Sequence, residues 1–263
     1  MSIILFKLLA TPFLIGSATL AGRRWGPIVN GLIVGLPLTS GPISFILAHQ
    51  YGPEFAAKAA AGNLAGQVSM CVFCLTYSLL AQKNNWPRSA ILAMAAYSLA
   101  TILLNGIAWQ LFPAFVALAI VIFVILRLIP QQPVSRFNAA PPRWDLPARM
   151  CIATAFVIVL TASANLLGPQ LSGLLSTFPV FGVIFAAFTH FQQGASATSR
   201  LLRGIVFGSI AYAFFFLTVG ACLTSLGIAA TYTIALGTAI AAGGISYSIY
   251  NALGRMIGLS SQL

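Results

Sequence analysis

Only two residues in this chain of 263 are acidic, Glu54 and Asp145, and only 6% of all residues are charged. A soluble domain of this size needs about a quarter charged residues to cover its surface. Hydrophobic residues make up 59% of the chain, and the mean hydropathy is +0.97. Most of the surface must therefore face lipid. This predicts an all-α integral membrane protein and excludes a soluble enzyme, a disulfide-stapled domain and a disordered chain.

Apolar runs long enough to cross a bilayer alternate with polar, proline and glycine breaks along the chain. A proline-rich hydrophilic loop over residues 130–149 leaves five such runs before it and four after it. The pattern predicts nine transmembrane helices, near residues 3–21, 27–48, 54–81, 88–105, 107–129, 150–166, 169–190, 198–224 and 227–253.

The 13 Lys and Arg residues test this count, because cytoplasmic loops of membrane proteins are rich in basic residues. With nine spans, eleven of them fall on one side, and only Lys7 and Lys58 fall on the other. This asymmetry predicts an external N-terminus and a cytoplasmic C-terminus. Membrane topology therefore accounts for the basic residues and for the net charge of +11, so no nucleic-acid partner is expected. A cleaved signal peptide is not expected, because no basic region precedes the first apolar run.

The sequence matches itself at an offset of 142 residues, without a gap, from residue 26 to residue 76. Twelve of the 51 pairs are identical, and seven of the twelve are Gly or Pro, which fix backbone shape. An odd number of spans separates the copies, so they insert with opposite orientation. We predict a 4+1+4 inverted-topology repeat: residues 1–106 form the first four-helix repeat, residues 107–149 a linking fifth helix and loop, and residues 150–263 the second repeat. Such repeats are typical of secondary transporters.

Both copies contain a helix that breaks in mid-membrane, at Pro37 and at Pro179. A proline break leaves backbone groups unpaired where only side chains, water or a ligand can pair with them. The pair of breaks therefore predicts a solute site; the alternative is two kinked helices whose hydroxyls bond to their own carbonyls. The candidate substrate-binding residues are Asn30, Pro37, Thr39, Ser40, Ser172, Ser176, Thr177 and Pro179.

A few ionisable residues near the helix ends are candidates for gating or coupling. Lys58 and Arg200 are equivalent in the repeat, so they can lie at opposite mouths of one pathway. Glu54 is one helical turn from Lys58, and the pair can instead merely solvate a helix start. Histidine titrates near neutrality, so a coupling proton is one role for a histidine here, and a simple helix-end residue is the other. The candidates are His49, Glu54, Lys58, His190 and Arg200.

Other patterns in the chain indicate packing rather than chemistry. The pairs Gly62/Gly66 and Gly204/Gly208 predict close helix contacts near a central pseudo-twofold axis. The four cysteines lie in apolar runs, so neither a disulfide nor a metal site is expected, even for Cys71 and Cys74. No nucleotide, zinc-protease or serine-hydrolase motif is present, and two acids provide no catalytic pair. The chain is therefore predicted not to be an enzyme and to need no cofactor.

The stretch Gly31-Leu-Ile-Val-Gly-Leu-Pro-Leu-Thr-Ser40 resembles the small GlpM-like bacterial inner-membrane proteins, which are four-helix chains about half this length. The resemblance covers one helix, and residues 174–182 echo it without the Leu-Pro-Leu-Thr-Ser pattern. It implies a fused duplicate of a four-helix unit in the bacterial inner membrane, and it transfers no substrate.

The leading interpretation is a secondary transporter that moves a small polar or anionic metabolite across the bilayer. The helix breaks supply amides, the mouths carry cations, and no buried acid is expected to neutralise a cationic solute. The alternatives are a small-solute channel, which passes solute without counterflow, and a non-transporting membrane subunit, which is inert alone. The expected partners are a small-molecule substrate and the lipid bilayer, and no particular oligomeric state is predicted.

Overall fold

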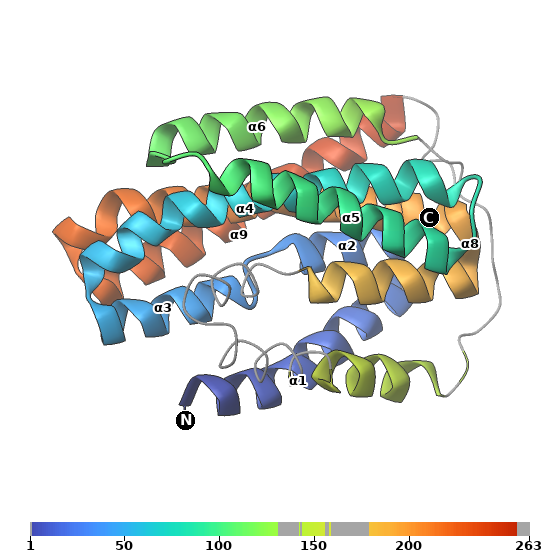
Figure 1. The fold of residues 1–263 in the computed structure, drawn as a ribbon, viewed down its shortest axis with the longest axis horizontal. Coiled ribbons are helices and arrows are strands. Elements are labelled where there is room, and N and C mark those ends of the chain that lie inside the picture. The colour runs from blue at the N-terminus through green and yellow to red at the C-terminus, as the bar shows by residue number, and fades with distance from the viewer. Residues whose placement is uncertain (1, 131–141, 143, 156–157, 159–178, 257–263) are drawn as a thin grey trace.

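A computed structural model describes residues 2–130, 142, 144–155, 158 and 179–256 of the chain. These residues form an all-α structure, as predicted, and residues 145–155 are helical in addition to the eight labelled helices (Figure 1). The helices are α1 (Ser2–Trp25), α2 (Pro27–Gly35), α3 (Ser40–Tyr51), α4 (Pro53–Ala81), α5 (Trp86–Asn105), α6 (Leu111–Leu128), α8 (Val180–Leu226) and α9 (Ile228–Met256).

Six helical stretches in the described residues are long and apolar enough to cross a membrane. The long helices α4, α5, α6, α8 and α9 lie along one common direction (Figure 1). The outward side of α6 is apolar: Phe112, Ile120 and Phe123 are 58% to 68% exposed. Exposing such an apolar surface to water is unfavourable, whereas contact between this surface and lipid is not. The chain is therefore a multi-pass membrane protein.

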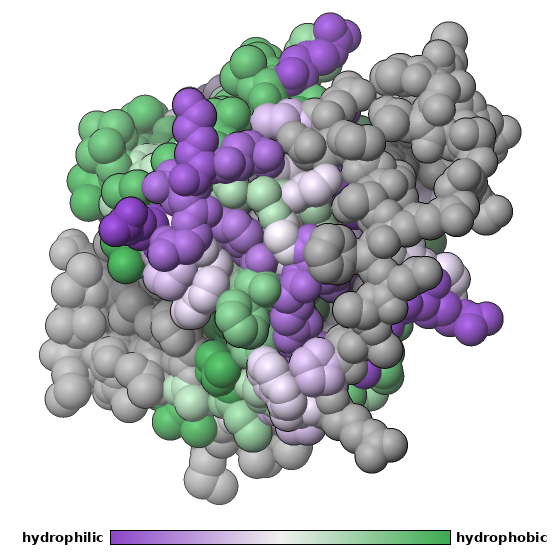
Figure 2. Space-filling model, turned by 90° about the vertical axis from the view of Figure 1, so that its right-hand side faces the viewer, coloured by the Kyte–Doolittle hydropathy of each residue, from purple (hydrophilic) through white to green (hydrophobic). Residues whose placement is uncertain are grey.

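One end of the bundle is polar. Figure 2 shows hydrophilic residues gathered on the side that lies at the right of Figure 1, where α4 ends and α5 begins. Gln82, Lys83 and Arg88 lie in and beside this turn and are exposed. This polar end of the bundle is the end that the distribution of basic residues predicts to be cytoplasmic.

Helices α4 and α8 form the centre of the bundle, since 61% of each apolar window is buried inside the protein. Phe73 and Tyr77 of α4 and Leu201 and Phe216 of α8 are fully buried. Gln67 Nε2 donates a hydrogen bond to Ser209 Oγ (2.8 Å). Toward the end of α4, Ser78 Oγ donates to Ser199 Oγ (2.9 Å). The residue number falls along α8 as it rises along α4, so the two helices are antiparallel.

Glycines allow α2 to cross α8 with backbone against backbone. A Cβ on Gly31 would overlap the Leu201 carbonyl oxygen, and a Cβ on Gly204 would overlap that of Ile28. Gly35 and Gly208 meet in the same way one turn further along. Small residues at this spacing are the means by which membrane helices approach closely. The packing role predicted for Gly204 and Gly208 is therefore confirmed.

The predicted breaks fall where the helices end or bend. The predicted span 27–48 is two helices, α2 and α3, separated by residues 36–39 around Pro37. Gly52 has φ 90° and joins α3 to α4, and Gly194 has φ 78° inside α8. Glycine accepts this backbone conformation at little cost. The predicted spans 150–166 and 169–190 are described only in part, at residues 150–155, 158 and 179–190, so the count of nine stays a prediction.

Candidate functional site

The Pro37 break lies beside an apolar groove. Pro37 has no N–H, and the helix resumes where the Gly41 N–H donates to the Pro37 carbonyl (2.9 Å). The groove encloses about 630 Å³, and its walls come from α2, α3, α8, α9 and the break itself, with Leu36, Phe45, Phe215 and Leu236 among them. Apolar walls of this kind suit a hydrocarbon chain better than a polar solute. The predicted polar lining is therefore not found on this side of the break.

The predicted substrate-binding residues are spread over several places. Asn30 is buried where α2 meets Gly22 of α1, and its Oδ1 has no hydrogen-bond partner. Thr39 is half-buried within the Pro37 break, and Pro179 is the buried residue directly before α8. Ser40 opens α3 and lines a second, polar cavity. The candidates Ser172, Ser176 and Thr177 lie outside the described residues.

The polar cavity lies between α3, α4 and the last turn of α5 and encloses about 470 Å³. Its polar lining includes Ser40, Ser44, Lys58, Asn63, Ser69 and Thr101. Apolar walls from α3, α4 and the segment after α5 include Leu47, Phe55 and Trp109. A cavity of this size, with a few polar groups among apolar walls, matches the usual form of a small-molecule site.

Two hydroxyls at this cavity have no hydrogen-bond partner among the described residues. Ser69 is fully buried, and neither its Oγ nor the Oγ1 of Thr101 has a hydrogen-bond partner. By contrast, Ser44 Oγ pairs with the Tyr232 hydroxyl (2.7 Å), and Asn63 Nδ2 donates to the Ala59 carbonyl (3.1 Å). Burying an unpaired hydroxyl costs about 1–3 kcal/mol. Water or a solute in the cavity would offset that cost.

Lys58 is exposed on the first part of α4 and brings the cavity its positive charge. Glu54 is exposed one turn earlier, and no ion pair joins it to Lys58. The ion pair is therefore not seen, but both residues are exposed at the start of α4, as the alternative of a solvated helix start predicts. The equivalent residue Arg200 is half-buried on α8 and is engaged in contacts there.

The two candidate histidines have different surroundings. His49 is exposed, and its ring packs against Phe45 with centroids 4.6 Å apart. His190 is half-buried, makes an edge contact with Tyr77 (5.8 Å), and has no hydrogen-bond partner at Nδ1. Neither ring lines the polar cavity.

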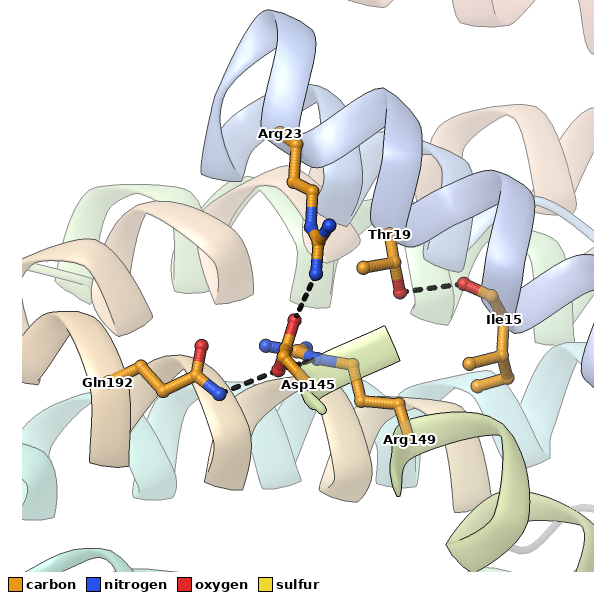
Figure 3. Close-up of polar contacts among 6 residues, drawn as sticks. All are labelled: Ile15, Thr19, Arg23, Asp145, Arg149 and Gln192. Atoms are coloured by element: carbon orange, nitrogen blue, oxygen red, sulfur yellow. Dashed lines mark hydrogen bonds and ion pairs between the residues drawn. The ribbon is translucent and has the colours of Figure 1, made fainter. Parts of the chain in front are cut away.

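A charged cluster that sequence reasoning missed surrounds Asp145 (Figure 3). Arg149 Nε donates to Asp145 Oδ1 (2.7 Å), Gln192 Nε2 donates to the same oxygen (2.6 Å), and an Arg23 guanidinium nitrogen lies 3.1 Å from Oδ2. Asp145 and Arg149 are nearly inaccessible, with side chains 2% and 4% exposed. Their one sequence signal was that Asp145 is one of only two acids in the chain.

The cluster joins three parts of the chain. Arg23 comes from the end of α1, Asp145 and Arg149 from the helical residues 145–155, and Gln192 from α8 two residues before its bend (Figure 3). The Arg149 guanidinium also lies over the Phe188 ring (4.8 Å). Burial alone would raise the pKa of Asp145, but the hydrogen bonds and charge of Arg149, with Gln192 and Arg23, hold that pKa below its usual value.

Cys71 and Cys74 behave as packing residues of α4, whereas Cys151 is exposed and Cys222 is half-buried. Cys71 and Cys74 are buried on α4 without a disulfide, and no group of three potential metal ligands occurs among the described residues. Neither observation supports a redox or metal site.

Comparison with known proteins found no family model, no curated protein and no solved structure that matches this chain. The resemblance of residues 31–40 to the GlpM-like proteins therefore stays a prediction, and the function has to be argued from the site itself.

Proposed function

We propose that this chain is a secondary transporter that moves a small polar or anionic metabolite across the bacterial inner membrane. The observation that carries the proposal is a polar cavity open on one half of an apolar bundle, while several equivalent positions in the second repeat, among them Ala197, Gly204 and Ala211, are buried. A carrier that alternates between two access states has this asymmetry in either state.

Three features of the structure support an inverted repeat with an offset of 142 residues: a pair of bends, a pair of helix starts and one contact. Gly52 and Gly194 both have positive φ, and α5 and α9 begin at Trp86 and Ile228, which are 142 residues apart. Gln67 and Ser209 are also equivalent, and they touch each other in an antiparallel helix pair. A residue that contacts its own copy lies on a twofold axis. These features favour an axis in the membrane plane at the contact between α4 and α8.

The two repeats differ in exposure at equivalent positions. Phe55, Gly62 and Lys58 are exposed, whereas their equivalents Ala197 and Gly204 are buried and Arg200 is half-buried. With the N-terminus outside, as the basic residues predict, the cavity is on the external half of the bundle. The proposed state is therefore open to the outside and closed to the cytoplasm. The Asp145 cluster, on the cytoplasmic half, belongs to the closed side.

Counterflow in proteoliposomes tests the proposal. Liposomes that contain the purified full chain are loaded with unlabelled glycolate, lactate or succinate, and uptake of the same labelled acid is followed. A carrier accumulates label transiently, a channel passes it without accumulation, and a non-transporting subunit does neither. Absence of counterflow for all three acids would overturn the proposal.

Two proline substitutions test the role of the Pro37 break in transport, one at the break and one control in α6. Pro37→Ala restores a backbone donor at the break, so it is expected to straighten the helix and reduce counterflow at least tenfold in folded protein. Pro113→Ala, in the first turn of α6 where proline is tolerated, is expected to leave counterflow unchanged. Equal effects of the two variants would show that the break has no role in transport.

A further inference from the structure

We infer that the polar cavity binds a small organic anion, with Lys58 as its charge partner and the Ser69 and Thr101 hydroxyls as its inner hydrogen-bonding groups. This narrows the proposed transport function to anions with hydroxyl or carbonyl groups and rests on that function for its physiological meaning. The cavity itself can be tested without transport.

The charge at the cavity is positive and has no acidic partner among its lining residues. Lys58 is the charged residue that lines it, and Glu54, the nearest acid along the chain, forms no ion pair with Lys58. The other acid, Asp145, is bound by Arg23 and Arg149 beside α8. A cation in a cavity walled by apolar side chains attracts anions more strongly than one in open water, because the dielectric constant is lower there.

Polar groups follow one another from the cation inward. Ser69 is eleven residues beyond Lys58 on α4, which corresponds to about 16 Å along the helix axis. Asn63 lies between them, and Thr101 and Asn105 face the cavity from α5. Ser69 is fully buried and unpartnered, so the protein leaves a hydrogen-bonding position open at the inner end. A compact anion with its charge toward Lys58 is shorter than this distance, so its hydroxyl or carbonyl group faces the polar groups further in, and water fills the remaining distance to Ser69.

The walls limit the size of the ligand. The cavity volume of about 470 Å³ and the walls formed by Phe55 and Trp109 suit a compact organic acid. A cation is disfavoured because no lining carboxylate is available to pair with it, and a purely apolar ligand would leave the inner hydroxyls unpaired.

Modification of a cysteine at position 62 measures the electrostatics of the cavity. Gly62 is exposed and lines the cavity, and an added Cβ there would meet no atom of the described residues within 4 Å, so Gly62→Cys is expected to fold. The variant is made in a background with Cys71, Cys74, Cys151 and Cys222 replaced by Ala. Its reaction rates with an anionic sulfonatoethyl and a cationic trimethylammonioethyl methanethiosulfonate are each divided by the rate of that reagent with a free thiol in solution.

The normalised anionic rate is expected to exceed the cationic rate about fivefold, as one cation at close range in a partly shielded cavity gives. Lys58→Gln is expected to bring the ratio close to one. Lys83→Gln removes the same charge from the exposed turn after α4 and is expected to leave the ratio unchanged. A ratio of one or less in the parent, or no effect of Lys58→Gln, would overturn the inference.

Two further measurements complete the test. Asn105→Cys, at an exposed residue on the opposite wall, is expected to show the same preference, and failure of both cysteines to react would show that water does not enter the cavity. Glycolate is expected to slow modification at position 62 more than the neutral ethylene glycol or the cationic ethanolamine. Equal slowing by the three would overturn the anion assignment. If the preference holds but counterflow is absent, the anion site stands and the transport proposal fails.

Discussion

The two glycine pairs occupy equivalent places in the proposed repeats and have different surroundings. Gly204 and Gly208 are buried under α2, whose backbone reaches them directly. Gly62 and Gly66 line the polar cavity, and an added Cβ at Gly62 would meet nothing. The same small-xxx-small spacing thus serves a tight helix crossing in one half and a cavity wall in the other. The neighbouring segment, not the glycine pair, decides which role results.

The two bends differ in the same way. Gly52 and Gly194 both join helices with positive φ, and each follows a glutamine by two residues. Gln192 donates to the buried Asp145, whereas Gln50 is exposed. The bend in α8 is therefore held to α1 and to residues 145–149, and the bend at Gly52 lacks such a cluster among the described residues. In the proposed carrier, this bend would lie on the closed side.

Leucine substitution at the equivalent glycines is expected to give the largest difference in effect between the two halves. A side chain at Gly204 would collide with the backbone of α2, so Gly204→Leu is expected to prevent folding, seen as loss of the monodisperse peak in detergent size-exclusion chromatography. Gly62→Leu has open space, so that variant is expected to fold and to lower counterflow by filling the cavity. Equal yields of folded protein would contradict the close crossing of α2 and α8.

The two acids of the chain provide the next comparison. Asp145→Asn removes the charge that neutralises the buried Arg149 and is expected to destabilise the protein by about 3 kcal/mol. Glu54→Gln changes an exposed residue without an ion pair and is expected to change stability by less than about 0.5 kcal/mol. Thermal unfolding in detergent at pH 7 measures both differences. Similar unfolding temperatures for the two variants would show that the Asp145 cluster does not hold the fold.

The pH dependence of the Asp145→Asn effect checks its cause. The pKa of Asp145 is lower in the folded protein than its usual value of 3.8, so the unfolded chain binds its proton first as the pH falls. The stabilisation is therefore complete above about pH 5 and is lost as the pH falls through the folded pKa. The difference in unfolding temperature between the parent and the variant is expected to be constant from pH 5 to 7 and to shrink below pH 4. A difference that stays constant below pH 4 would assign the effect to packing, because packing does not depend on the protonation of Asp145.

The breaks in the helices could be predicted from sequence because proline and glycine act through the backbone alone. Pro37, Gly52 and Gly194 change the helix path wherever their side chains point. The Asp145 cluster could not be predicted, because Arg23 and Gln192 are 122 and 47 residues from Asp145 and no local pattern joins them. The polar cavity was missed for a similar reason, since its walls come from three helices. Of the predicted site residues that the structure describes, only Ser40 and Lys58 line it.

The glutamine pair provides the smallest and most local comparison. Gln192 Nε2 bonds to the Asp145 carboxylate, and a hydrogen bond to a charged group is worth about 1.5–3 kcal/mol. Because Arg23 and Arg149 still hold Asp145 when the amide is lost, Gln192→Ala is expected to cost about 1 kcal/mol in thermal unfolding. Gln50→Ala, at the equivalent and exposed position, is expected to cost almost nothing. Cysteine modification provides the sharper test, because releasing the α8 bend should shift the proposed carrier toward its inward-open state. Gly62→Cys would then react more slowly with external reagent in the Gln192→Ala background than in the Gln50→Ala background. Equal rates would mean that the cluster stabilises the fold without setting which side is open.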